Sequence, residues 1–186
     1  MLLVYENRTD GIVVEWKKTV HFPPHLHEAI EVVYDIRICD SPKEMEHIVI
    51  EKNRIRNRAR ILAGYCWNLD GGDAFAINPD SVHEAGCIHT SQGLEFDYVG
   101  VIIGDDMRYE NGEIVTDYSK RAKTDQSMKG IKGLAKDDPE KASQLADEII
   151  KNTYRTLMTR GMKGCYVYCT DSELAAYLKE RLKSRG

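Results

Sequence analysis

The sequence of 186 residues lacks any apolar run that approaches the ~20 residues required to cross a bilayer. It does not open with a basic stretch followed by an apolar one, which is the pattern of a secretory leader. Internal repeats and low-complexity tracts are also lacking. We therefore expect a cytoplasmic protein without a membrane partner.

The five cysteines contain no C-x-x-C pair, and their odd number argues against a disulfide framework. Four of them lie in apolar runs, where cysteine usually serves as a small hydrophobic residue: Cys66, Cys87, Cys165 and Cys169. Cys165 and Cys169 share one face of a predicted strand because they are four residues apart. A zinc site there is the less favoured alternative to a place in the core.

An apolar content of 42% and a charged content of 30% are ordinary for a soluble protein, and the length suits one α/β domain with a core. The net charge of −4 argues against a wholly basic nucleic-acid-binding surface, but leaves room for local basic tracks. One candidate track runs from Lys52 to Arg60, where we favour a solvated face. The other follows the lysines of residues 120–136, where phosphate contact and a solvated face are equally supported.

The pattern along the chain predicts an α/β fold with a mostly parallel sheet flanked by helices, after a short β-rich segment at residues 1–35. A capping box at Ser41–Glu44 opens the first helix, and Asp171 caps the last one. Helices are predicted at 42–58 and 139–159 and after Asp171, and strands at 59–67, 74–77, 86–90, 98–104 and 164–170. Residues 108–138 are polar and weakly periodic, so we expect an excursion or a mobile insert there.

Two polar clusters stand beside predicted strands. The first follows the strand at 86–90 and gathers seven polar or small residues: His89, Thr90, Ser91, Gln92, Gly93, Glu95 and Asp97. Polar residues at strand ends form ligand sites in α/β proteins. The second cluster contains Arg160 and Lys163, between the helix at 139–159 and the next strand.

These side chains suit the chemistry of phosphates and sugars. Glu95 can accept hydrogen bonds from a ribose, and the fork of Arg160 suits a terminal phosphate. The alternatives are structural: Gln92 and Glu95 could cap a helix, and Arg160 could be a surface arginine favoured by a helix dipole.

Residues 89–99 (HTSQGLEFDYV) resemble motif V of superfamily 1 helicases, and residues 155–163 (RTLMTRGMK) resemble their motif VI. More closely, residues 36–182 resemble the C-terminal part of the Schlafen group 3-like DNA/RNA helicase domain. The stretches AGYCW, AINPDSV, CIHTSQGLEFDYVGVIIG and TRGMKGCYVY are typical of that family. The resemblance implies that residues 36–186 form a second RecA-like lobe.

The resemblance also implies roles for individual residues. Glu95 would contact the ribose of ATP, and Arg160 would be an arginine finger on the γ-phosphate. Gln92 and Lys163 are assigned to the same nucleotide site, with Gln92 between it and the nucleic-acid contacts. His89, Thr90 and Gly93 would lie near the backbone of single-stranded DNA or RNA.

The chain departs from the family in lacking a Walker A motif, G-x-x-x-x-G-K-S/T, and an acidic pair resembling Walker B. A first RecA-like lobe would have to supply both motifs, and with them the Mg²⁺ that accompanies ATP. We therefore expect no ATP hydrolysis by this chain alone. The alternative function is a non-catalytic nucleic-acid-binding or regulatory module.

Residues 1–35 carry a separate pattern, because His25, His27 and Glu31 have the spacing of the first metal-binding motif of cupins. The surrounding stretch resembles the start of the cupin-like sensing domain of AraC-type regulators. A metal-binding sensor is therefore a further alternative. We favour a leftover or fused β-hairpin without metal, because the rest of a barrel does not follow.

Overall fold

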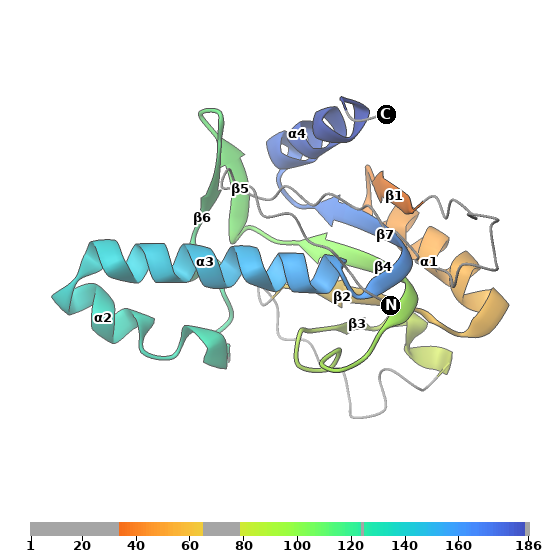
Figure 1. Ribbon diagram of the computed structural model, residues 1–186, viewed down its shortest axis with the longest axis horizontal. Coiled ribbons are helices and arrows are strands. Elements are labelled where there is room, and N and C mark those ends of the chain that lie inside the picture. Colours follow the sequence, from red (N-terminus) through yellow and green to blue (C-terminus); the bar gives the residue numbers. More distant parts are fainter. Residues whose placement is uncertain (1–33, 65–78, 124, 185–186) are drawn as a thin grey trace, which may run out of the picture.

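The computed structural model describes residues 34–64, 79–123 and 125–184. Five parallel strands form the central sheet, in the order β1-β7-β4-β2-β3 (Figure 1). Their bounds are Asp35–Ile38 for β1, Ala59–Ala63 for β2, Ala85–Gly86 for β3, Phe96–Ile103 for β4 and Gly161–Cys169 for β7. The predicted α/β fold with a parallel sheet is confirmed.

The helices are α1 (Pro42–Arg56), α2 (Ile131–Asp137), α3 (Pro139–Met158) and α4 (Ser172–Lys183). None of the helices in the described ranges is long and apolar enough to cross a membrane. The segment 1–33, with His25, His27 and Glu31, lies outside the described residues. So do the strand predicted at 74–77 and the last part of the strand predicted at 59–67.

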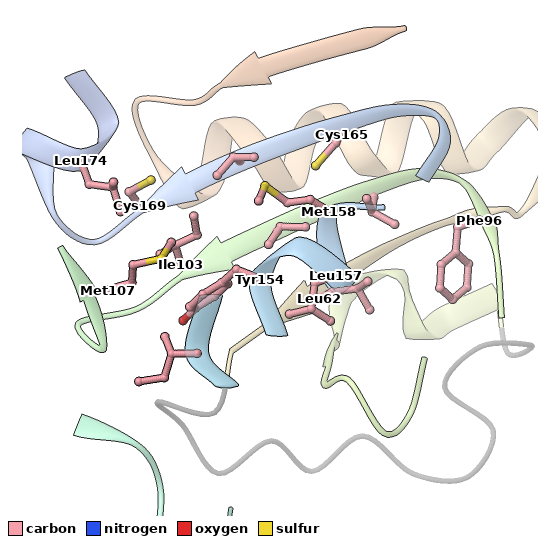
Figure 2. Packing of buried hydrophobic residues seen from close by; sticks show 14 residues of the cluster. Leu62, Phe96, Ile103, Met107, Tyr154, Leu157, Met158, Cys165, Cys169 and Leu174 are labelled. Atoms are coloured by element: carbon pink, nitrogen blue, oxygen red, sulfur yellow. The ribbon is translucent and has the colours of Figure 1, made fainter. Parts of the chain in front are cut away.

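Helices α1 and α3 cover opposite faces of the sheet. Along β4, Val99, Val101 and Ile103 pack in the core with the buried face of α3, while Tyr98 and Ile102 pack in the cluster that contains Met45 and Val49 of α1. This explains why the strands read as nearly continuous apolar runs. Figure 2 shows Tyr154 and Leu157 of α3 lying against Leu62 and Ile103 of the sheet.

The close approach of α1 to the sheet depends on Gly100. A Cβ atom at this position would lie 2.9 Å from Cγ2 of Val49. The helix begins as predicted: the Ser41 hydroxyl accepts a hydrogen bond from the Glu44 amide at 3.1 Å, and Pro42 occupies the first turn. It ends at Arg56, because Asn57 adopts the left-handed conformation with φ of 51°.

Residues 108–138, where an excursion or a mobile insert is expected, contain regular structure. Strands β5 (Met107–Glu110) and β6 (Glu113–Thr116) form an antiparallel hairpin, followed by 3₁₀ turns at Tyr118–Lys120 and Gln126–Met128 and by α2. The hairpin turns at Asn111 and Gly112, both with positive φ, which is the Asn-Gly pair favoured in two-residue hairpin loops. Tyr109 stacks on Tyr177 of α4 with ring centroids 4.3 Å apart, so the hairpin is anchored.

Three further expectations need correction. The strand predicted at 86–90 is only Ala85–Gly86, because the following residues form tight turns. The spacing of the apolar residues within 139–159 predicts that Leu145 lies on the buried face of α3, whereas Leu145 is 41% exposed. Arg60, expected in a solvated basic face, is fully buried in β2, where it donates to Asn53 Oδ1 at 3.1 Å.

Candidate functional site

The two predicted clusters meet at the amino-terminal ends of β4 and β7. Phe96 pairs with Gly161 in the parallel register, and the Phe96 amide donates to the Arg160 carbonyl at 2.9 Å. Glu95 and Arg160, 65 positions apart in the sequence, are therefore neighbours. The first cluster does follow the carboxyl end of β3, as expected, but Glu95 and Arg160 themselves lie at the opposite edge of the sheet.

Local hydrogen bonds hold the turn between β3 and β4. The Thr90 hydroxyl accepts from the Cys87 amide at 2.8 Å and bonds the Cys87 carbonyl at 3.0 Å. The Ser91 hydroxyl is buried and bonds the carbonyls of Cys87 and Ile88. These two hydroxyls therefore stabilise the turn, and Thr90, a predicted nucleic-acid contact, has its side-chain oxygen engaged within it.

The other predicted residues of this turn face solvent. His89, Gln92, Gly93 and Glu95 are all exposed. Gly93 has φ of +75°, and a Cβ atom there would meet nothing within 4 Å. Glycine is therefore favoured by its backbone conformation, and the space beside it is open to a ligand.

The Asp97 side chain, at the start of β4, contacts residues at the starts of two other strands. These contacts were not predicted from the sequence. Its carboxylate lies 2.7 Å from the Lys163 amine of β7 and 3.3 Å from Nε of Arg58, which precedes β2. Arg58 also donates to the Glu95 carbonyl at 3.3 Å. Lys163 was predicted to bind nucleotide, and in this structure its amine is paired with Asp97. Arg58 and Asp97 thus position the backbone around Glu95.

Arg160 is partly buried, and its Nε atom is buried without a hydrogen-bond partner among the described residues. A buried donor without an acceptor costs about 1–3 kcal/mol, more when it is charged. Such groups are rare in folded proteins and point to a strained or functional position. The described residues include no cluster of three or more His, Cys, Asp or Glu side chains that could hold a metal ion.

The path of the chain after Arg160 depends on two glycines. A Cβ atom at Gly161 would lie 2.2 Å from the Gly164 carbonyl oxygen, and one at Gly164 would lie 2.5 Å from the Asp35 carbonyl oxygen. Both contacts involve backbone, which cannot move aside easily. The register shift between β4 and β7 near Phe96 and Tyr98 lies at the same place.

We expect Gly161→Ala to destabilise the protein by about 1–3 kcal/mol, as other overpacking substitutions do. Urea unfolding followed by circular dichroism measures this effect. The matched control is Gly133→Ala in α2, where an added Cβ meets nothing within 4 Å, and which should stabilise by about 0.5–1 kcal/mol. Equal effects of the two substitutions would contradict the close approach at Gly161.

The chain matches the family model described as Schlafen group 3, DNA/RNA helicase domain, over residues 10–74 and 67–171. These segments cover well over half of the chain, so the protein belongs to the Schlafen group 3 DNA/RNA helicase domain family. The match begins at residue 10 and therefore extends into residues 1–35, for which the cupin-like resemblance remains a prediction.

The chain is also similar to the uncharacterized protein YPL245W of Saccharomyces cerevisiae, with 28% identity over 173 residues. The aligned part is 80% of this chain and 36% of the yeast protein, so the chain spans little more than a third of that relative. No solved structure matches the chain.

Proposed function

We propose that this chain is the second RecA-like lobe of a nucleotide-driven helicase. In this role it contacts ATP and single-stranded DNA or RNA, and it hydrolyses ATP only together with a first lobe that carries Walker A and Walker B. The observation that carries the proposal is the pairing of Phe96 with Gly161, which makes Glu95 and Arg160 neighbours. The membership in a DNA/RNA helicase domain family supports it.

The chemistry of the nucleotide site follows from these two residues, which the pairing of β4 with β7 brings together along the backbone. The exposed Glu95 carboxylate accepts hydrogen bonds from the ribose hydroxyls. Arg160 donates to the γ-phosphate, which gives its buried Nε the acceptor that the described residues do not provide. Gln92 lies in the turn that leads to Glu95, and Lys163 adds positive charge while it holds Asp97. Mg²⁺ would be held through the first lobe.

The nucleic-acid contacts come from the same turn. His89 and Gly93 are exposed, and the absence of a side chain at Gly93 lets a phosphodiester backbone approach closely. Thr90 contributes by fixing the shape of the turn, because its hydroxyl is bonded to Cys87. Such contacts to the backbone do not read sequence.

The test of the ribose contact is a calorimetric titration of the purified chain with ATP and with 2′,3′-dideoxy-ATP. We expect Glu95→Gln to weaken ATP binding by roughly fivefold or more, since a hydrogen bond to a charged group contributes ~1.5–3 kcal/mol. The original chain should prefer ATP, and this preference should be smaller in the variant, because the amide oxygen of Gln accepts weaker hydrogen bonds than a carboxylate does. Glu113→Gln, at an exposed carboxylate of the hairpin, is the matched control and should retain the preference.

Loss of the preference in the Glu113 variant, or an undiminished preference in the Glu95 variant, would refute the ribose contact. Binding of a single-stranded oligonucleotide without any binding of ATP would assign the chain to the alternative class, a non-catalytic nucleic-acid-binding module. Hydrolysis of ATP by the chain alone would contradict the need for a first lobe.

A further inference from the structure

A second candidate site lies in the insert, in a hollow of about 410 Å³. Its lining includes Tyr118, Ala122, Lys123, Gln126, Met128 and Lys129. The volume falls within the ~300–1,000 Å³ of small-molecule sites. Arg121 connects this part of the insert to Asp106, which follows the carboxyl end of β4. The hollow is therefore at the edge of the sheet opposite to Glu95 and Arg160.

Buried ion pairs hold the shape of the hollow. Arg121 contacts Asp106 at 2.9 Å and Asp125 at 2.8 Å, and the three side chains are at most 1% exposed. Asp125 also accepts hydrogen bonds from the amide and hydroxyl of Ser127, at 2.9 and 2.6 Å. The wall between the two 3₁₀ turns is therefore formed before any ligand arrives, which lowers the entropic cost of binding.

The floor and the rim of the hollow differ in chemistry. Tyr118 and Met128 are partly buried and pack against two hydrophobic clusters of the core, so their remaining surface forms an apolar floor. Lys123 and Lys129 are exposed at the rim, and their amines form no ion pair with any carboxylate of the described residues. The buried group around Arg121 has one more carboxylate than guanidinium. An anionic group is therefore favoured at the rim and disfavoured at the floor.

We propose that this hollow binds a phosphorylated aromatic ring, namely a nucleotide, either free or as one unit of a single strand. The ring lies against Tyr118 and Met128, since aromatic side chains stack on any base and sulfur contacts ring edges favourably. The phosphate lies between the lysines of the rim. This site is separate from the one at Glu95 and Arg160, and it does not depend on that proposal.

The experiment is a ¹H–¹⁵N NMR titration of the full chain with three probes in turn: AMP, inorganic phosphate and a six-nucleotide single strand. We expect the amide signals of residues 118–130 to shift with AMP, with the single strand or with both. Response to AMP identifies a free nucleotide as sufficient, and response to the strand alone identifies a unit of nucleic acid. Signals of residues 89–95 and 158–163 report separately on the other site, so each proposal can fail on its own.

Variants test the two parts of the site. The double variant Lys123→Ala, Lys129→Ala should weaken binding at the hollow by roughly fivefold or more. Lys136→Ala should leave this binding unchanged, because Lys136 is an exposed lysine of the same insert outside the hollow. Tyr118→Phe keeps the ring and should bind normally, and Tyr118→Leu should lose roughly fivefold or more. Amide spectra of the free variants establish that each one is folded.

Three results would overturn the proposal. The first is no shift at residues 118–130 with any probe. The second is an equal response to inorganic phosphate and AMP together with unchanged binding by Tyr118→Leu, which would remove the ring from the site. The third is an equal loss of binding in the Lys136→Ala control, which would mean that the lysines act only through the overall positive charge of the insert.

Discussion

Arg160→Ala is expected to abolish the chain's preference for ATP over ADP, with a loss of roughly tenfold or more in ATP affinity and little change for ADP. Hydrogen bonds between charged groups contribute ~1.5–3 kcal/mol, and only ATP carries the γ-phosphate that Arg160 is proposed to contact. Calorimetric titration of the chain with both nucleotides measures this preference. Arg155→Ala is the matched control, because Arg155 is an exposed arginine of α3 that bonds Asn152.

The same variant should have a larger effect on catalysis once a first lobe is present. An arginine finger contributes ~10³–10⁵ to the rate of phosphoryl transfer, so ATP turnover of the joined lobes should fall by about a thousandfold. Binding of a single strand should be retained. Arg160→Lys should recover little, because an ammonium group lacks the planar fork.

The stability of the Arg160 variant separates a functional role from a structural one. The Nε atom of Arg160 has no hydrogen-bond partner among the described residues, so its removal leaves no acceptor unsatisfied. We expect the free energy of unfolding to stay within about 1 kcal/mol of the original. A loss of stability in urea that parallels the loss of ATP binding would mean that Arg160 acts by holding the fold, and the arginine-finger proposal would fail.

The long elements of this fold could be predicted because their signals are local. The start of helix α1 was predicted from a capping box and a proline. Helix α3 was predicted from apolar residues at helical spacing, and its predicted end at residue 159 is next to its end in the structure, Met158. The strands β4 and β7 follow from apolar runs long enough to be buried on both faces. In each case the residues that decide the structure are within one turn or one strand of each other.

The hairpin of β5 and β6 was missed because each strand has only four residues and because β6, Glu-Ile-Val-Thr, does not alternate between apolar and polar residues. Its one strong local signal, Asn111-Gly112, was available in the sequence and would have predicted the turn. The anchoring of the hairpin through Tyr109 and Tyr177 could not be predicted, because those residues are 68 positions apart and nothing local pairs them.

The candidate site divides in the same way. The residue types of the two clusters were readable from the sequence, but their meeting depends on the register of β4 and β7, which is a tertiary property. The contacts of Asp97 with Lys163 and Arg58 join three separate strand starts. No spacing in the sequence indicates contacts among three strand starts. Lys163 was therefore assigned to the nucleotide site without its ion pair to Asp97.

The largest effect on stability is expected from Asp106→Ala. This carboxylate accepts hydrogen bonds from Arg121 and from the Tyr154 hydroxyl, which in turn accepts one from the Gly104 amide at 3.0 Å. Burial alone would lower the pKa of Arg121, but hydrogen bonds and charges of Asp106 and Asp125 outweigh burial and raise that pKa above its usual range. Arg121 stays charged when Asp106 is removed, because a guanidinium does not lose its proton in proteins and Asp125 still contacts it.

Removing Asp106 takes a buried, charged acceptor from Arg121 and from the Tyr154 hydroxyl, while Arg121 keeps its contact with Asp125. Each hydrogen bond to a charged group contributes ~1.5–3 kcal/mol, which makes about 3–6 kcal/mol for the two. We expect Asp106→Ala to lower the free energy of unfolding in urea by that amount. Asp105→Ala is the matched control, since Asp105 is exposed and its bond to the Thr170 hydroxyl should contribute only about 1 kcal/mol.

The triple variant Asp106→Leu, Arg121→Met and Asp125→Asn distinguishes the loss of polar contacts from the loss of packing. Asp125 is changed as well, because its carboxylate would otherwise stay buried without the guanidinium that it contacts at 2.8 Å. Replacement of buried ionic groups by uncharged residues of similar size is often neutral or stabilising, so the triple variant should recover most of the loss. Hydrogen exchange should show the single variant opening first at residues 118–130, where Arg121 holds the two 3₁₀ turns against α3 and the end of β4. A uniform loss of protection across the sheet, or a triple variant as unstable as the single one, would instead mean that Asp106 supports the central sheet directly and that the insert does not depend on its charge.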